Sequence, residues 1–155
     1  MREELLEAWR TNNRISLFLI EHISQEGMDC TLSQHGGRDV ARQFAHLHNV
    51  RIYHLEKRAR DLAPGLEKFP TKVSPSKAEL ERAFKASGRA IEIFLTDVLE
   101  GKPKRRGFRK GIFTTLAYLV AHDSHHRGSI LLTLKTSGHK LDQATQSAIW
   151  GWDQM

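Results

Sequence analysis

Apolar residues recur at steps of three and four along most of the chain, which is the spacing of one face of an α-helix. Four long segments carry this pattern, at residues 2–25, 38–61, 75–99 and 110–136, and a shorter one covers 141–152. Strand-type alternation of apolar and polar residues is nearly absent. The pattern predicts an all-α fold, an up-down four-helix bundle with a short C-terminal helix.

The residues that bound these segments support the prediction. Gly27 is expected to end the first helix, and Asp39 to act as N-cap of the second. Ser74 followed by Pro75 is typical of a helix start, and Gly138 of a helix end. Residues 63–75 hold three of the four prolines, so we expect a long connection there, with room for a crossover.

Length and composition are those of one domain spanning residues 1–155. The chain is 39% hydrophobic and 27% charged, ordinary values for a globular protein. The single cysteine, Cys30, excludes an internal disulfide and fits a reducing compartment. There is no apolar run near the roughly 20 residues that span a bilayer, and no apolar signal region at the start. We therefore expect a cytoplasmic protein with no membrane contact.

The net charge of +6 is partly concentrated in one predicted loop, residues 102–110, with six lysines and arginines. Such a loop can attract acidic small molecules or nucleic acid over long range. Only Phe108 is interleaved with the basic residues, whereas a base-stacking surface needs several aromatic rings. The composition therefore favours a solvated loop over nucleic-acid binding.

Three of the nine histidines lie within five positions of the fourth predicted helix. His122 and His126 fall on the same stripe as Leu119, Ile130 and Leu134, so we expect both rings to face inward, one turn apart. A buried polar ring without a partner costs on the order of 1–3 kcal/mol, and a metal ion would supply the partner. The alternative is a pair of hydrogen-bonded core histidines.

A second histidine cluster, in the segment 38–61, offers a third ligand; it comprises His46, His48 and His54. Two imidazoles from one helix and one from another make a three-histidine site with a free coordination position, as in zinc enzymes that hold water or substrate. Counted from Phe44 and Leu47, His48 points more nearly at the core than His46 does. Helical periodicity thus favours His48.

Two segments carry a resemblance to a known family. They are residues 39–51, DVARQFAHLHNVR, and residues 121–130, AHDSHHRGSI. Together they are similar to the DinB/YfiT-like superfamily of small bacterial metal-binding helical bundles. The resemblance covers nearly the whole chain in length, helix order and placement of both segments, and the His-x-x-x-His-Arg-Gly motif of the second segment is its most specific part.

The resemblance implies a set of metal ligands. In the family, one ligand follows a helix-opening valine by six residues, which marks His46 after Val40, and the later pair corresponds to His122 and His126. His48 is then either the reserve ligand or a hydrogen-bonding partner of a ligand.

Three further residues of the fourth predicted helix are of a type that could take part in chemistry. Arg127 would bind an anionic group of the substrate, or else pair with a carboxylate of a neighbouring helix. His125 is rotated by about 100° from His126 and is expected to contact another helix or solvent. Asp123 gives the segment a superficial likeness to the helix of zinc peptidases, but no third peptidase ligand is visible.

The resemblance also implies a function. Imidazole ligands suit zinc and nickel equally, and relatives of this fold include thiol-dependent S-transferases and an isomerase. We expect an enzyme of S-transferase or hydrolase type, whose divalent metal activates a low-molecular-weight thiol or water for attack on a small electrophile. Apart from the three ligands, the sequence pattern does not identify any residue as a catalytic acid or base.

The alternative to an enzyme is a non-catalytic metal-binding stress-response or dimerising module. Trp150 and Trp152, near the C-terminus, suit either a homodimer surface or a cover for the open end of the bundle.

Overall fold

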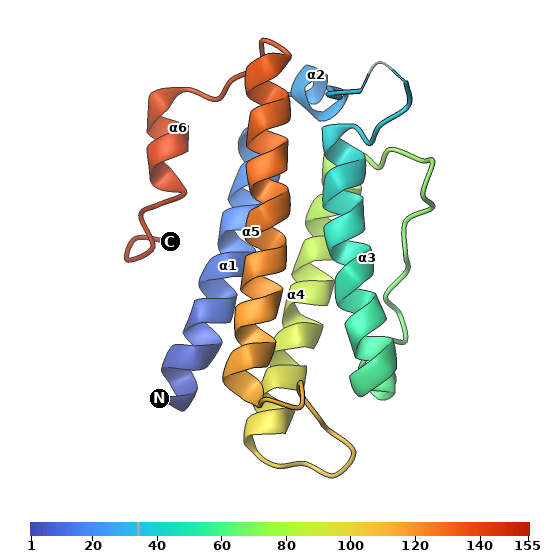
Figure 1. Cartoon of the computed structure of the whole chain (residues 1–155), viewed down its shortest axis with the longest axis vertical. Helices are drawn as coiled ribbons and strands as arrows, with labels where there is room; N and C mark the ends of the chain where they lie inside the picture. Colours follow the sequence, from blue (N-terminus) through green and yellow to red (C-terminus); the bar gives the residue numbers. More distant parts are fainter. Residues whose placement is uncertain (34) are drawn as a thin grey trace.

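The computed structural model describes residues 1–33 and 35–155 and is an elongated helical bundle (Figure 1). The long helices are α1 (Arg2–His22), α3 (Val40–Arg58), α4 (Lys77–Leu99) and α5 (Ile112–Thr136). The shorter elements are α2 (Gln25–Met28), the 3-10 turn η1 (Arg60–Leu62) and α6 (Gln143–Ala148). The described residues contain no strand, so the predicted all-α bundle with a short C-terminal helix is confirmed. None of the described helices is long and apolar enough to cross a membrane.

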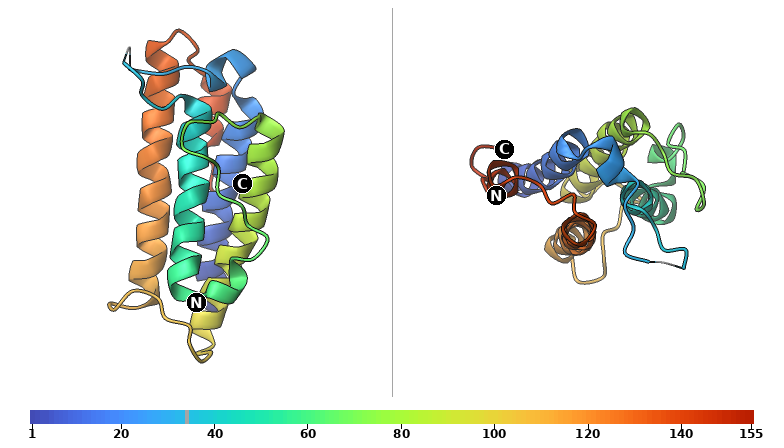
Figure 2. Two further views of the ribbon diagram at one scale, coloured as in Figure 1. Left: turned by 90° about the vertical axis from the view of Figure 1, so that its right-hand side faces the viewer. Right: turned by 90° about the horizontal axis from the view of Figure 1, so that it is seen from above.

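Helix directions follow from which residues meet. Trp9 of α1 donates to the carbonyl of Gly88, and Lys77 at the start of α4 donates to carbonyls at the end of α1, so these two helices are antiparallel. Phe44 of α3 packs edge-to-face on Phe84 of α4, and further along both helices Arg51 donates to the hydroxyl of Ser87. Because the residue numbers of both helices increase from the first contact to the second, α3 and α4 run in the same direction. Residues 59–76 therefore form a crossover that returns along the bundle (Figure 2).

Side chains of α3 hold this crossover in place. The amide of Asn49 donates to the carbonyl of Phe69 at 2.8 Å and accepts from its N–H at 2.9 Å. One residue earlier, Nε2 of His48 lies 3.0 Å from the carbonyl oxygen of Glu67. The backbone of a long irregular segment thus finds partners on the helix that it covers.

The helix N-termini of α3 and α4 are set by side-chain caps. Asp39 accepts from the N–H of Arg42 at 2.7 Å, so the predicted cap of α3 is confirmed. The start of α4 was placed too early, because Ser76 rather than Ser74 is the N-cap and forms a capping box with Glu79. The Ser74 hydroxyl instead donates to the carboxylate of Asp39.

The predicted C-terminal end is confirmed for α5 but not for α1. Gly138 has φ +80° and follows α5, and the N–H of His139 reaches back to the carbonyl of Leu134 at 2.8 Å. Glycine is favoured there because a side chain is strained in this left-handed conformation, so the predicted end is confirmed. The first helix instead stops at His22, and Gly27 lies inside the short helix α2.

The interior consists of two apolar clusters separated by a polar layer. One cluster surrounds Phe44 and Phe84, and the other surrounds Trp9 and Phe94. Between them lie buried polar side chains from all four long helices: Asn12, Ser16, Arg51, Ser87, Asp123 and Arg127. This polar layer lies at the level of His122 and His126, and its contacts position the helix that carries these two histidines.

Two helical glycines provide a test of packing at this level. A Cβ atom on Gly88 would lie 2.6 Å from Cγ of Asn13, whose side chain is held by Arg51, whereas a Cβ atom on Gly128 would meet nothing within 4 Å. We expect Gly128→Ala to raise the free energy of unfolding by about 0.5–1 kcal/mol, because alanine favours the helix. Gly88→Ala should lower it by about 1–3 kcal/mol through overpacking.

Urea unfolding of the two variants beside the wild type measures both effects. Equal stabilisation by the two alanines would contradict the packing of Asn13 described above.

Candidate metal centre

Three histidines from two helices converge at the contact between α3 and α5. One ligand nitrogen from each of His46, His122 and His126 can be chosen so that all three lie within 4.8 Å of one another. The ring centroids of His46 and His126 are 4.7 Å apart, as are those of His122 and His126. Nitrogens around one tetrahedral zinc lie about 3.3 Å apart, so small ring rotations would bring them to a shared ion.

The state of these rings fits a metal ion. All three are partly buried, and none makes a side-chain hydrogen bond within the part of the chain that the structure describes. Burial and the neighbouring rings of His122 and His46 lower the pKa of His126 to about 4. Burial, then the positive charge of Arg38, also lowers the pKa of His46. Neutral imidazole is the form that binds metals, so His46 and His126 are prepared for one at neutral pH.

The three histidines lie at the flank of the helix interface and not on the core-facing stripe. On α5 the buried positions include Leu119, Asp123 and Arg127, whereas His122 and His126 are only partly buried. The expectation that both histidines replace core residues was therefore wrong. A buried charge can occupy a core position when partners compensate it, and apolar periodicity does not record such positions.

The same distinction decides between the two candidates on α3. His48 is 1% exposed and faces α4 and the crossover, with its ring 5.4 Å from that of Phe69. His46 lies two residues away, about 200° around the helix, and faces α5. The structure therefore brings His46, and not His48, to the pair on α5. Helical periodicity predicted correctly that His48 points to the core, but the cluster of three histidines lies outside the core.

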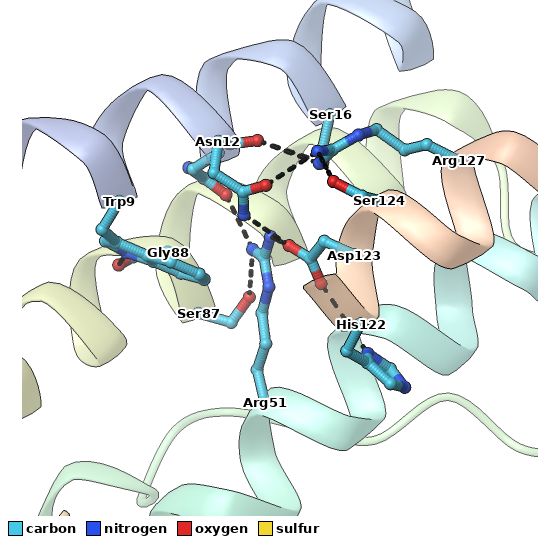
Figure 3. A network of polar contacts seen from close by, with 11 residues as sticks. Trp9, Asn12, Ser16, Arg51, Ser87, Gly88, His122, Asp123, Ser124 and Arg127 are labelled. Carbon is cyan, nitrogen blue, oxygen red and sulfur yellow. Dashed lines mark hydrogen bonds and ion pairs between the residues drawn. The ribbon is translucent and has the colours of Figure 1, made fainter. Parts of the chain in front are cut away.

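A buried network stands directly behind the centre (Figure 3). Oδ2 of Asp123 accepts from a guanidinium nitrogen of Arg51 and from the amide of Asn12, both at 2.8 Å. Arg51 also donates to Oδ1 of Asn13 at 2.7 Å, and its guanidinium lies 4.9 Å from the centre of the Trp9 ring. One carboxylate thus joins α1, α3 and α5.

Asp123 also faces the metal centre. Its Oδ1 lies 3.9 Å from Nδ1 of His122, so the carboxylate acts on this ring through its charge. A carboxylate on the Nδ1 side favours a proton there and leaves Nε2 with the lone pair that a metal requires. Burial raises the pKa of Asp123, but the charge of Arg51 and the hydrogen bonds to the carboxylate outweigh burial and lower it to about 2. Asp123 is therefore ionised at neutral pH.

Arg127 belongs to the same network. It is 7% exposed and donates to the side chain and carbonyl of Asn12, to Ser16 and to Ser124. These contacts tie α5 to α1 and point away from the three histidines. A role of Arg127 in substrate binding remains a prediction. His125 was expected to contact either another helix or solvent, and its side chain is exposed to solvent.

Aromatic rings that the sequence reasoning missed border the centre on its other side. Tyr118, one turn before His122, stacks on that ring with centroids 6.0 Å apart. Its ring also contacts Phe108 and His54, the remaining member of the early histidine cluster. The spacing of four residues between Tyr118 and His122 could have predicted that their rings lie next to each other on one face of the helix.

The basic loop is partly neutralised. Lys102 and Arg105 both form ion pairs with the buried carboxylate of Asp97, and Arg105 also pairs with Asp61. Two of its six cations thus anchor the loop to the bundle. The expectation of a solvated loop rather than a nucleic-acid-binding one stays a prediction.

Comparison with known proteins agrees with the geometry. The family model described as "DinB family" matches residues 1–150, nearly the full length of the chain. The chain belongs to the DinB family. No curated protein matches it, so no activity transfers to this DinB-family member from a characterised relative.

Removal of each ligand tests the centre directly. We expect His46→Ala, His122→Ala and His126→Ala to weaken zinc binding by more than the 10–100-fold that loss of an outer partner costs, that is by about 100-fold or more. His139→Ala, at an exposed position after α5, and His48→Gln, which keeps a donor near Glu67, should bind zinc like the wild type. Competition with a chromophoric chelator measures the affinities. Unchanged zinc affinity in the His46 variant would contradict the assignment.

Loss of the buried carboxylate should affect both stability and metal affinity. Asp123→Asn leaves Arg51 buried without its counter-ion, and we expect the free energy of unfolding to fall by about 3–5 kcal/mol. Zinc affinity should fall by about 10–100-fold, because His122 loses the charge that orients its proton.

The double variant Arg51→Met with Asp123→Asn removes the unpaired charge, so it should lose less stability than the sum of the two single variants. Urea unfolding and zinc titration of the same preparations measure both effects, and additive losses would argue against a coupled pair.

Proposed function

We propose that this DinB-family protein is a divalent-metal-dependent enzyme of S-transferase or hydrolase type. The observation that carries the proposal is the convergence of His46, His122 and His126 at a partly buried position. Three protein ligands leave a coordination position for a reactant, as in catalytic rather than structural zinc sites. Zinc and nickel both suit an all-imidazole set.

A bound divalent ion would lower the pKa of a thiol or water in the open position and so supply a nucleophile near neutral pH. The residues of the chain provide the conditions for this chemistry. The lowered pKa of His126 and of His46 keeps both rings unprotonated at neutral pH, and the charge of Asp123, 3.9 Å from Nδ1 of His122, favours a proton on that nitrogen over Nε2.

The substrate has access from solvent. His126 borders a surface pocket of about 290 Å³, large enough for a small organic molecule but below the size of a drug-sized cavity. In a thiol transfer, the sulfur bonds to an electrophilic carbon and the leaving group departs as an anion. In hydrolysis, a hydroxide attacks the carbonyl carbon of an ester or amide and the alcohol or amine departs.

The experiment pairs nucleophiles with model electrophiles. Protein loaded with one equivalent of zinc or nickel is assayed with a small thiol and chlorodinitrobenzene, and with a nitrophenyl ester in water. We expect turnover that is abolished by a chelator and restored by added metal. His126→Ala should be inactive, and His139→Ala should match the wild type, because its side chain is exposed and away from the cluster.

Metal uptake without turnover of either kind would contradict the enzymatic proposal. It would favour the non-catalytic metal-binding or dimerising module, for which Trp150 offers an exposed apolar surface.

A further inference from the structure

Aromatic rings form a contiguous surface that begins at the metal centre. Tyr118 of α5 lies beside the ligand His122, with ring centroids 6.0 Å apart and planes inclined by 22°. Its other neighbours are Phe108, in the loop before α5, at 5.0 Å and His54 of α3 at 5.1 Å. The centroids of Phe108 and His54 are 5.9 Å apart. We call the three rings of His54, Phe108 and Tyr118 the aromatic wall, and His122 adjoins it.

Solvent reaches the aromatic wall at Tyr118, which is 39% exposed. Contacting carbon atoms lie about 3.5–4.0 Å apart, so a centroid distance of 6.0 Å means that the rings of Tyr118 and His122 do not fully cover each other. Phe108 is partly buried, and the guanidinium of Arg58 lies 4.5 Å from its ring centre. His54 is 8% exposed and lies below the surface. Tyr118 is therefore the member of the wall that offers most ring area to a molecule from solvent.

The loop that carries Phe108 is fixed by backbone contacts on both sides. The N–H of Phe108 donates to Oγ1 of buried Thr115 at 2.7 Å, and its carbonyl accepts from the N–H of Gly111 at 2.9 Å. Arg58 donates to the carbonyl of Gly107 at 2.9 Å. A Cβ atom on Gly107 would lie 2.5 Å from Oγ1 of Thr115, so glycine permits this close approach. The wall is thus formed before a ligand arrives, which lowers the entropic cost of binding.

The rings behind Tyr118 carry no charge at neutral pH. Phe108 is apolar, and burial, followed by the positive charge of Arg58, lowers the pKa of His54 to about 4. An uncharged aromatic surface suits the ring of a ligand better than an ionic group.

We propose that Tyr118 is a specificity-determining residue, on whose ring an aromatic electrophile stacks with its reacting carbon at the histidine centre. Stacked aromatic rings have centroids about 4.5–7 Å apart, and the distance from Tyr118 to His122 falls in the same range. One ligand ring with its substituent therefore spans the distance from the wall to the centre. The inference rests on the proposed function for the reaction, but binding of the aromatic ring does not require it.

A pair of matched probes tests the binding of a ring. 2-Naphthoate and decahydro-2-naphthoate share a carbon skeleton and a carboxylate, but only the first is flat and aromatic. Both are titrated into protein stripped of metal by a chelator, because a carboxylate also binds metal ions. We expect naphthoate to bind about 2–10-fold more tightly, the value of an aromatic pair beyond its buried area.

Chemical-shift titration measures the dissociation constants and locates the probe. The ring signals of His122, at the edge of the wall, should shift on addition of naphthoate. Those of His139, at an exposed position after α5, should not.

Variants connect the preference to Tyr118. Tyr118→Phe keeps the ring and should keep the preference for naphthoate, whereas Tyr118→Leu should bind the two probes equally. Phe113→Leu removes a ring from α5 that is 61% exposed and lies outside the wall, and it should match the wild type. Circular dichroism confirms that each variant is folded.

A second readout uses zinc-loaded protein with a small thiol. Tyr118→Leu should lower kcat/KM for chlorodinitrobenzene by about 2–10-fold, because the stacking contact is lost. The value for iodoacetamide, an electrophile without a ring, should stay unchanged. In both reactions the sulfur bonds to carbon and a halide departs.

The outcomes separate this site from the metal chemistry. Equal binding of the two probes by the wild type, an unchanged preference in Tyr118→Leu, or naphthoate binding that leaves the His122 signals in place would each overturn the proposal. These results do not depend on turnover. A preference that Tyr118→Leu abolishes, in a protein that turns over neither electrophile, would contradict the proposed function and support the aromatic binding site.

Discussion

The buried ion pair between Arg51 of α3 and Asp123 of α5 governs the geometry of this protein. Both side chains are almost fully excluded from solvent, and their contact measures 2.8 Å. Asp123 lies directly after His122, and Arg51 follows His46 by five residues on the opposite helix. The pair that registers α3 against α5 thereby also sets how closely the histidines of the two helices approach. The register of the helices and the candidate metal centre depend on the same carboxylate.

The pair does not act alone, because further hydrogen bonds are needed to offset the cost of removing both charges from water. Asn12 bridges the two halves of the layer by donating to Asp123 and accepting from Arg127, and Trp9 covers the Arg51 guanidinium (Figure 3). An apolar interface would tolerate sliding of one helix past another, whereas a shifted helix here would leave charges unpaired. The polar layer thus gives the bundle one register at the level where the metal centre needs it.

Much of the fold was predictable from local patterns. Apolar spacing located all four long helices to within a few residues, and Asp39 and Gly138 marked helix ends because caps depend on short-range hydrogen bonds and backbone freedom. The start of α4 was misplaced because Ser74 and Ser76 offer similar caps and only the partner of Ser74 across the bundle distinguishes them. The sequence predicted an up-down order of the helices with room for a crossover, and α3 and α4 in fact run in the same direction, because the loop between them is long enough for a crossover but does not by itself require one.

The sequence by itself determined that His122 and His126 lie one turn apart on a helix, and its resemblance to a family selected His46 as their partner. The tertiary structure decided that these rings flank the core while Asp123 occupies it, and that His48 binds the crossover instead. The physical reason is that periodicity distinguishes apolar from polar positions only. An imidazole is found both in the core and at its edge. A buried carboxylate cannot be told from a surface carboxylate in the sequence, because the cation that neutralises it lies on another helix.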